Sequence, residues 1–387
     1  MKMKLARFNK PRLLKRIQRD LLGAFFARFR EDLAARGLSL PAPELADTDY
    51  YAALTRLLLA PEDLPDRLNE ALFAIDEMAG PRGREQLELA AARSGLEPPA
   101  ESTNEDLALR LWLAAPALLA RLHNRQRLLR LSAFEYFAGE NSTAPPAPPG
   151  PAAVNALAAG LDKWFARHQR GRSTARIEIH EIDGEWWFLV RHGDTFARTP
   201  AVEEQRTEVL HFRPEKDDVV VYSPERDEIR INARTRGERE LYVGQLGLCL
   251  RGRADYFRRR RTYTLEPLRD AGPGALDTQD IEGIRRITLR QIEIALDNSF
   301  HEVTTRAADD LFRCAAANCP GPEPIPRDGV ITRAAFELWF ADSAKPRLVQ
   351  VRPPNTLKLS RHCDARCVSH WLSRRGFRVV EPRGLQP

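Results

Sequence analysis

One short segment of the chain combines residue types that could perform chemistry. The seven residues Leu189–Thr195 read Leu-Val-Arg-His-Gly-Asp-Thr, so Arg191 and His192 end a run rich in aromatic and β-branched residues that predicts a strand. A neutral imidazole can act as a nucleophile, and an adjacent guanidinium can neutralise the charge on a phosphoryl group. Phosphoryl transfer is therefore one chemistry that the segment indicates.

The string Arg191-His192-Gly193 resembles the strand-end motif of the histidine phosphatase superfamily. The resemblance implies that His192 accepts the phosphoryl group and that Arg191 binds its charge. A second histidine would have to approach from far along the chain, and His370 is the candidate. That superfamily places a helix after its motif, whereas here strand-like runs precede and follow it. The alternative is an ordinary strand whose Arg191 and His192 face solvent or a domain interface.

The cysteines allow a structural metal site. Five cysteines, an odd number in a chain without a secretory segment, argue against a disulfide framework. Four of them form two pairs, Cys314 with Cys319 and Cys363 with Cys367, and four thiolates can hold Zn²⁺ tetrahedrally. Their gaps are wider than the usual two residues, and cysteines four apart on a helix are typical of a buried face. Zinc and plain thiols both remain open, and no other cofactor is expected.

Arginine clusters suggest a surface for nucleic acid. Tyr256, Phe257 and Tyr263 flank the densest cluster, and guanidinium groups beside aromatic rings suit phosphate contact and base stacking. The alternative is that these arginines are solvated or paired, because the chain also contains 54 Asp and Glu residues. The predicted nucleic-acid-binding residues are Arg251, Arg253, Arg258, Arg259, Arg260, Arg261, Arg285 and Arg286.

Other catalytic motifs are weak or absent in the sequence. The run Glu215-Lys216-Asp217-Asp218 has the carboxylates and the lysine of a nuclease-like metal site, but it begins an expected strand, where charges normally mark a turn. The sequence contains no phosphate-binding loop, dinucleotide fingerprint, zinc-protease helix or nucleophile elbow. These absences lower the expectation of an enzyme without excluding dispersed catalytic residues.

The bulk composition indicates a soluble, cytoplasmic protein. Apolar residues make up 43% and charged residues 29% of the 387 residues, and no window of 18 uninterrupted apolar residues occurs. We therefore expect no membrane partner. The formal net charge of +6 and the pI of about 9.2 permit an acidic partner, either protein or nucleic acid.

The predicted fold class is α+β and multidomain. We expect an all-helical N-terminal domain over residues 1–140, a Pro-rich linker over 141–152, an antiparallel α+β domain over 153–270 and a smaller α+β domain over 275–387. Apolar residues at helical spacing predict helices over residues 11–36, 48–60, 65–79, 83–95, 103–137, 153–168, 238–250, 306–317 and 360–375. Strand-like runs occur at 175–182, 185–191, 207–213, 218–223, 228–233, 262–266, 284–296, 330–341, 347–352 and 377–380.

A broader pattern spans roughly residues 155–380. The pattern is similar to a family of uncharacterised bacterial proteins in the strings Arg191-His192-Gly193, Phe212–Lys216, Asp218–Tyr222, Glu228–Thr235, Glu240–Tyr242 and Tyr263–Leu268. The resemblance implies a bacterial, cytoplasmic protein and transfers no catalytic residue. We expect a non-enzymatic binding or regulatory subunit of a bacterial antiviral defence or DNA-handling complex, which contacts nucleic acid or an acidic protein through arginine-rich surfaces. The alternative is a phosphoryl-transfer enzyme that uses His192.

Overall fold

The structure is a computed structural model of the whole chain. It describes residues 7–8, 10–80, 83–99, 101–129, 131–140, 146–203, 206–318, 325–326, 328–343, 345–359 and 364–379. The chain divides into two compact units, Met1–Leu128, here called the helical unit, and Leu129–Pro387, called the sheet unit. No helix among the described residues has both the length and the apolar character needed to cross a membrane.

The helical unit consists of helices around a core of leucine and aromatic side chains. Leu54, Leu72 and Leu107 are among the side chains buried where the helices meet. The three helices predicted between residues 48 and 95 are confirmed as α4, α5 and α6. The helices are α1 (Pro11–Leu14), α2 (Arg19–Ala27), α3 (Arg30–Ala34), α4 (Asp47–Leu58), α5 (Asp66–Met78), α6 (Arg84–Arg93), α7 (Asn104–Ala114) and α8 (Pro116–Leu128).

The single helix predicted over residues 11–36 is wrong, because the chain breaks between α1 and α2. Tyr51 donates its hydroxyl to the carbonyl of Ile17 at 2.8 Å, and the backbone N–H of Gln18 donates to Asp106 Oδ1 at 2.9 Å. Both backbone groups would be needed for a continuous helical ladder. Contacts with α4 and α7 therefore take the place of local hydrogen bonds.

The helix predicted over residues 103–137 is correct only as far as Leu128. Pro116 divides α7 from α8 as expected, because proline is tolerated only in the first turn of a helix. Residues Ala133–Ala138 form strand β1 and not the end of that helix. The residues that pair with this strand are distant in sequence; Tyr136 pairs with Arg230, and Phe134 pairs with Leu357.

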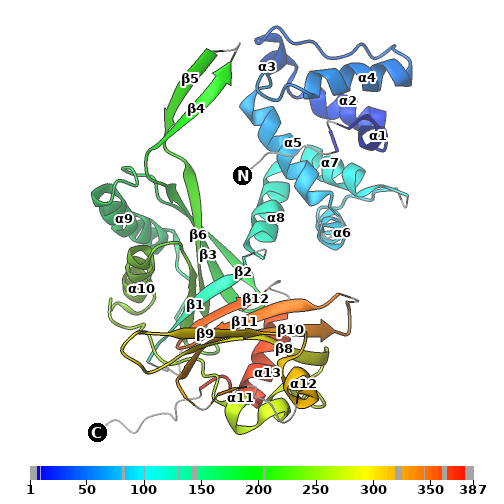
Figure 1. Cartoon of the computed structure of the whole chain (residues 1–387). Coiled ribbons are helices and arrows are strands. Elements are labelled where there is room, and N and C mark those ends of the chain that lie inside the picture. Colours follow the sequence, from blue (N-terminus) through cyan, green and yellow to red (C-terminus); the bar gives the residue numbers. More distant parts are fainter. Residues whose placement is uncertain are drawn as a thin grey trace. The chain divides into compact units, whose positions relative to one another are not determined.

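The sheet unit is built on one ten-stranded antiparallel sheet in the order β2-β3-β6-β7-β1-β12-β11-β10-β8-β9 (Figure 1). The helical N-terminal part and this sheet with its helices confirm the predicted α+β fold class. The strands are β1 (Ala133–Ala138), β2 (Arg176–Ile182), β3 (Glu185–Gly193), β6 (Glu215–Ser223), β7 (Glu228–Asn232), β8 (Ile284–Ala295), β9 (Val303–Ala307), β10 (Val330–Phe340), β11 (Arg347–Arg352) and β12 (Thr356–Leu359).

The predicted domain boundaries do not coincide with the division into two units. The helical unit ends at Leu128 and not near residue 140. In the Pro-rich segment, residues 141–145 lie outside the described residues, and Pro151 opens helix α9 (Pro151–Arg167). Strands from both 153–270 and 275–387 belong to the same sheet, so no boundary between compact units falls near residue 270.

Helices cover opposite faces of the two halves of this sheet. Helices α9 and α10 (Arg236–Arg251) pack on β3, β6 and β7 around Phe165, Phe188, Val220 and Leu246. Helix α13 (Ala365–Arg374) packs on the other face, where the rings of Trp371 and Phe336 on β10 are 5.1 Å apart. In Figure 1, α11 (Pro267–Asp270) and α12 (Leu311–Ala317) lie on the same side of β8–β12 as α13, and the turn η1 (Gly272–Leu276) follows α11.

A separate two-stranded hairpin extends from the large sheet (Figure 1). Strand β4 (Ala197–Glu203) pairs with β5 (Arg206–Phe212) and with no strand of the main sheet. The sequence predicted β5 but missed β4, β9 and β12. The short strands predicted at 262–266 and 377–380 are wrong for their described residues, which contribute a single bridge between Tyr263 and Arg378.

Candidate functional site

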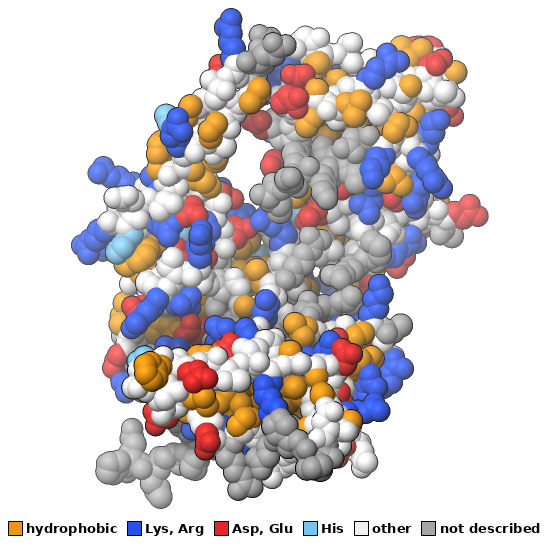
Figure 2. Space-filling view, in the orientation of Figure 1, with side chains coloured by type: hydrophobic (Ala, Val, Ile, Leu, Met, Phe, Trp, Pro, Cys, Tyr) orange, Lys and Arg blue, Asp and Glu red, His pale blue; other side chains and the backbone are white. Residues whose placement is uncertain are grey.

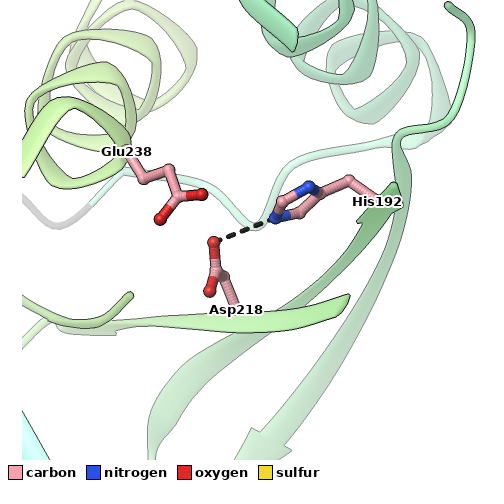
Figure 3. A group of neighbouring side chains, drawn as sticks. All are labelled: His192, Asp218 and Glu238. Atoms are coloured by element: carbon pink, nitrogen blue, oxygen red, sulfur yellow. Dashed lines mark hydrogen bonds and ion pairs between the residues drawn. The ribbon is translucent and has the colours of Figure 1, made fainter. Parts of the chain in front are cut away.

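His192 lies at the end of β3, where its ring is completely buried beneath α9 (Figure 3). The ring stacks on Phe165 of α9, with centroids 4.2 Å apart. Its Nε2 lies 3.0 Å from Asp218 Oδ2, and its Nδ1 lies 2.8 Å from the carbonyl oxygen of Gly193. Both ring nitrogens therefore face hydrogen-bond acceptors inside the protein.

Asp218 and Glu238 bring two carboxylates to the same point from different elements. Asp218 lies on β6, where register pairing places it beside β3, and it also accepts a hydrogen bond from the Tyr242 hydroxyl at 2.9 Å. Glu238 is the third residue of α10, where its carboxylate accepts the backbone N–H of Thr235 in a capping box. Helix capping thus fixes Glu238 over the sheet.

Lys216 supplies the positive charge between these carboxylates. Its ammonium is 2.8 Å from Glu238 Oε2 and 3.2 Å from Asp218 Oδ1, and Arg170 approaches Glu238 Oε1 at 3.2 Å from the other side. We call His192, Lys216, Asp218, Glu238 and Tyr242 the buried charge cluster. Its carboxylates each have a cationic partner, which is the condition for burying charge at tolerable cost.

The pKa values in the buried charge cluster follow from these contacts. Burial by itself raises the pKa of Glu238, but hydrogen bonds from Lys216 and Thr235, together with the Lys216 charge, outweigh it and lower the pKa. Burial, and then the charge of Asp218, raise the pKa of Tyr242 well above its usual range. Glu238 is therefore held ionised, and Tyr242 remains a hydrogen-bond donor.

The same residues include a possible set of metal ligands. One ligand atom from each of His192, Asp218 and Glu238 lies within 4.8 Å of the others. A divalent ion between them would have to displace the Lys216 ammonium, which already bonds to both carboxylates. The donor set therefore does not fit a metal ion while Lys216 is charged, and the cluster is a buried salt-bridge network.

The structure does not assemble the predicted phosphatase site. Arg191 binds Glu178 at 2.8 Å and lies 3.4 Å from Asp217, so carboxylates occupy its guanidinium. His370 is exposed on α13, which packs on β10, and five strands separate β10 from β3 in the sheet. His370 therefore lies far from His192, whose ring nitrogens both have internal partners.

Only two of the four cysteines of the predicted zinc site lie among the described residues. Cys314 is exposed on α12, and Cys367 is half-buried on α13. Cys319 and Cys363 lie outside the described residues. The group of candidate metal ligands that converges within the described chain contains no cysteine.

Most of the predicted nucleic-acid-binding arginines have partners within the chain. Arg251 binds Asp227 at 2.9 Å, and Arg253 binds Glu140 at 2.9 Å. Arg285 donates to the backbone carbonyl of Phe340 at 2.8 Å. The remaining contacts are those of Arg258 with Asp255, Arg259 with Glu135, Arg261 with Thr264, and Arg260 with a partner elsewhere in the chain. Carboxylates therefore offset the charge of Arg251, Arg253, Arg258 and Arg259, whereas Arg261 and Arg285 bond to neutral oxygens.

Arg286 differs from the other predicted arginines in its position. It lies on a face of the sheet that no described helix of the sheet unit covers (Figure 1). Register pairing puts Arg286 opposite Trp339, Glu337 opposite Leu348, and Lys358 opposite Gln350 on that face. The Arg286 guanidinium lies 3.9 Å above the Trp339 ring. We call this surface the open sheet face and define it by Arg286, Trp339, Leu348, Arg352 and Lys358.

The glutamates on the open sheet face have cationic partners, but three of its cations have no carboxylate partner among the described residues. Glu293 binds Arg333 at 3.2 Å, and Glu337 lies 3.9 Å from Arg290. Arg286, Arg352 and Lys358 are exposed and have no carboxylate partner among the described residues. The face therefore has an excess of positive charge next to an indole ring.

Arg352 and Lys358 are not among the predicted nucleic-acid-binding residues, although the sequence around Arg352 carries a sign of its exposure. The run Arg347–Arg352 alternates, with Leu348 and Arg352 exposed and Val349 and Val351 buried, which is typical of a strand with one solvent-facing side. Lys358 lies on the same side of the sheet because it pairs with Gln350 of β11, and this pairing is known only from the register of the folded sheet.

Comparison with known proteins adds no relative from which a role could be transferred. The chain matches no family model, and no curated protein matches it.

Proposed function

We propose that the protein is a non-enzymatic binding protein that contacts single-stranded nucleic acid through the open sheet face. One observation carries the proposal: Arg286, Arg352 and Lys358 lie on one uncovered face, and no described carboxylate neutralises them. Cations in this state can release counterions from a phosphate backbone when they bind it. Arginines that already have carboxylate partners contribute less.

The shape of the open sheet face favours a single strand. From Lys358 to Arg286 the register spans three strand spacings and four residues along β10, which corresponds to about 20 Å. Several phosphates of one strand fit within that distance. The planar Arg286 guanidinium on Trp339 offers a stacking surface to an unpaired base, which is how single strands are generally recognised.

The test is a titration of labelled single-stranded and double-stranded oligonucleotides by fluorescence anisotropy across a salt series. We expect tighter binding of the single strand and a linear fall of log affinity with log salt, with a slope of about −2 for three phosphate contacts. The triple variant Arg286→Ala/Arg352→Ala/Lys358→Ala should bring that slope close to zero, since its three side chains are exposed.

The matched control is Arg253→Ala/Arg258→Ala, which removes two exposed arginines that pair with Glu140 and Asp255. This control should keep the wild-type slope. Absence of binding at low salt, or a triple variant that binds as the wild type does, would overturn the proposal.

A further inference from the structure

The β4–β5 hairpin, here called the arm, leaves its apolar side chains exposed. Val202 is 80% exposed, Leu210 51% and Phe212 45%, and every residue of β5 is exposed. Figure 2 shows hydrophobic side chains along the arm at the upper left. A two-stranded hairpin is only marginally stable alone in water and needs a further strand or a packed surface. The arm therefore has the properties of an element that is completed by a partner.

The two edges of the arm differ in their capacity to accept another strand. Strand β4 contains Pro200, which has no N–H to donate. Strand β5, Arg206–Phe212, reads Arg-Thr-Glu-Val-Leu-His-Phe and contains no proline, no lysine and no bulge relative to β4. Proline and lysine are common means of blocking edge pairing. The β5 edge lacks them and is open to strand addition.

The register of the arm also indicates where a new strand would pair. Pro200 is directly opposite Val209. Because proline occurs in strands where its nitrogen faces away from the ladder, the two residues form a non-hydrogen-bonded pair. The N–H and carbonyl of Val209 then point outward from the β5 edge, as do those of Thr207 and His211 by alternation.

We infer that the arm pairs with the arm of a second copy of this chain, through antiparallel addition of β5 to β5 centred on Val209. This arrangement is two-fold symmetric and gives a four-stranded sheet in which Thr207 of each copy pairs with His211 of the other. On the same register Arg206 lies opposite Phe212 of the second copy, where a guanidinium and an aromatic ring attract each other. Every outward backbone group from Thr207 to His211 gains a partner.

The charge of the arm agrees with a second copy as the occupant. Residues 197–212 contain two arginines and three glutamates, so the arm does not attract a polyanion and has too little net charge to prevent self-association. A contact between two seven-residue strands is small for a specific interface. We therefore expect a dimer with a dissociation constant of about 1 to 10 μM.

The first experiment is sedimentation analysis of the full chain from about 1 to 100 μM, a range that brackets this dissociation constant. The weight-average mass should rise from 43.9 kDa towards twice that value. Val209→Pro removes the central outward N–H of β5 and should weaken the dimer at least tenfold. The control Val202→Pro changes the β4 edge and should dimerise as the wild type does. A wild type that stays monomeric, or a Val209→Pro dimer of wild-type strength, would overturn the inference.

A second measurement does not depend on how well the arm tolerates proline. In the proposed register the two Val209 Cα atoms are about 5.5 Å apart, which is within the range of a disulfide. Under mild oxidation Val209→Cys should form a covalent dimer much faster than Val202→Cys or the wild type, whose own cysteines set the background. Equal rates for the two cysteine variants would contradict pairing along β5.

Discussion

One face of the ten-stranded sheet is covered by helices in one half of the sheet and is not covered by a described helix of the sheet unit in the other half. Over β3, β6 and β7 that face is covered by α9 and α10, and its charged residues are buried with partners in the buried charge cluster. Over β8, β10, β11 and β12 no described helix of the sheet unit covers it, and Arg286, Arg352 and Lys358 keep unmatched charge. Residues that resemble an active site are thus held in a salt-bridge network in one half of the sheet, while the surface proposed for binding lies in the half whose cations lack described carboxylate partners.

Lys216→Met should have the largest effect, because it tests whether the buried charge cluster stabilises the fold. The variant removes the ammonium that Asp218 and Glu238 share, so we expect a loss of about 3 to 5 kcal/mol in the free energy of unfolding. Urea denaturation measures it. Lys163→Met, which changes an exposed lysine of α9, should cost less than about 0.5 kcal/mol. A small effect at Lys216 would reopen the metal interpretation.

His192→Phe separates a structural role from a catalytic one. The new ring can still stack on Phe165, but Asp218 loses a hydrogen-bond partner, so we expect about 2 kcal/mol of destabilisation. We expect no hydrolysis of an aryl phosphate by the wild type. The wild type could instead show phosphatase activity that is lost in a folded His192→Phe variant. That result would contradict a purely structural role for His192.

Trp339→Ala tests the contribution of the indole to binding at the open sheet face. Loss of the indole removes the support for Arg286 and one stacking surface, so affinity for a single-stranded oligonucleotide should fall about tenfold. The salt slope should change little, because no phosphate contact of the indole is lost. Leu248→Ala, an exposed apolar residue on α10, is the control and should bind normally.

Glu238→Gln has the smallest expected effect and depends on pH. Because the folded-state pKa of Glu238 is lowered, its ionised form adds stability above the unfolded pKa of about 4.3, and this stability is lost as pH falls through the folded pKa. The variant should therefore cost about 1 kcal/mol at pH 7, and thermal unfolding near pH 3 should show a smaller difference. A difference that grows on acidification would contradict the assignment.

The sequence predicts the strands around His192 well, because aromatic and β-branched runs separated by turn residues leave little choice of structure. It fails where stability comes from distant residues. Strand β1 has no local signal that separates it from α8, and β12 is four residues long and depends on β1 and β11 for its partners. Periodicity describes one segment at a time and cannot supply such pairings.

The candidate sites show the same limit. Lys216 and Asp218 looked like the charges of a turn, since nothing in the sequence shows that the capping glutamate of α10 meets them. For Arg258 and Arg259 the sequence left nucleic-acid contact and internal pairing both open, since only the folded chain shows that Asp255 and Glu135 are their partners. Three of the predicted arginines have no carboxylate partner among the described residues: Arg261 bonds to a hydroxyl, Arg285 bonds to backbone carbonyls, and Arg286 lies over the Trp339 ring.

The position of β1 in the centre of the sheet has a consequence for biosynthesis. The backbone carbonyl of Tyr136 on β1 accepts a hydrogen bond from Asn355, which lies 219 residues later in the chain. At a translation rate of about 5 to 20 residues per second, β1 leaves the ribosome on the order of 10 to 40 s before that partner exists. During that interval the helical unit can fold on local contacts, while β1 has an unpaired edge towards β12. The nascent chain is therefore open to mispairing at β1 during that interval, and a chaperone that shields residues 133–138 would favour correct folding.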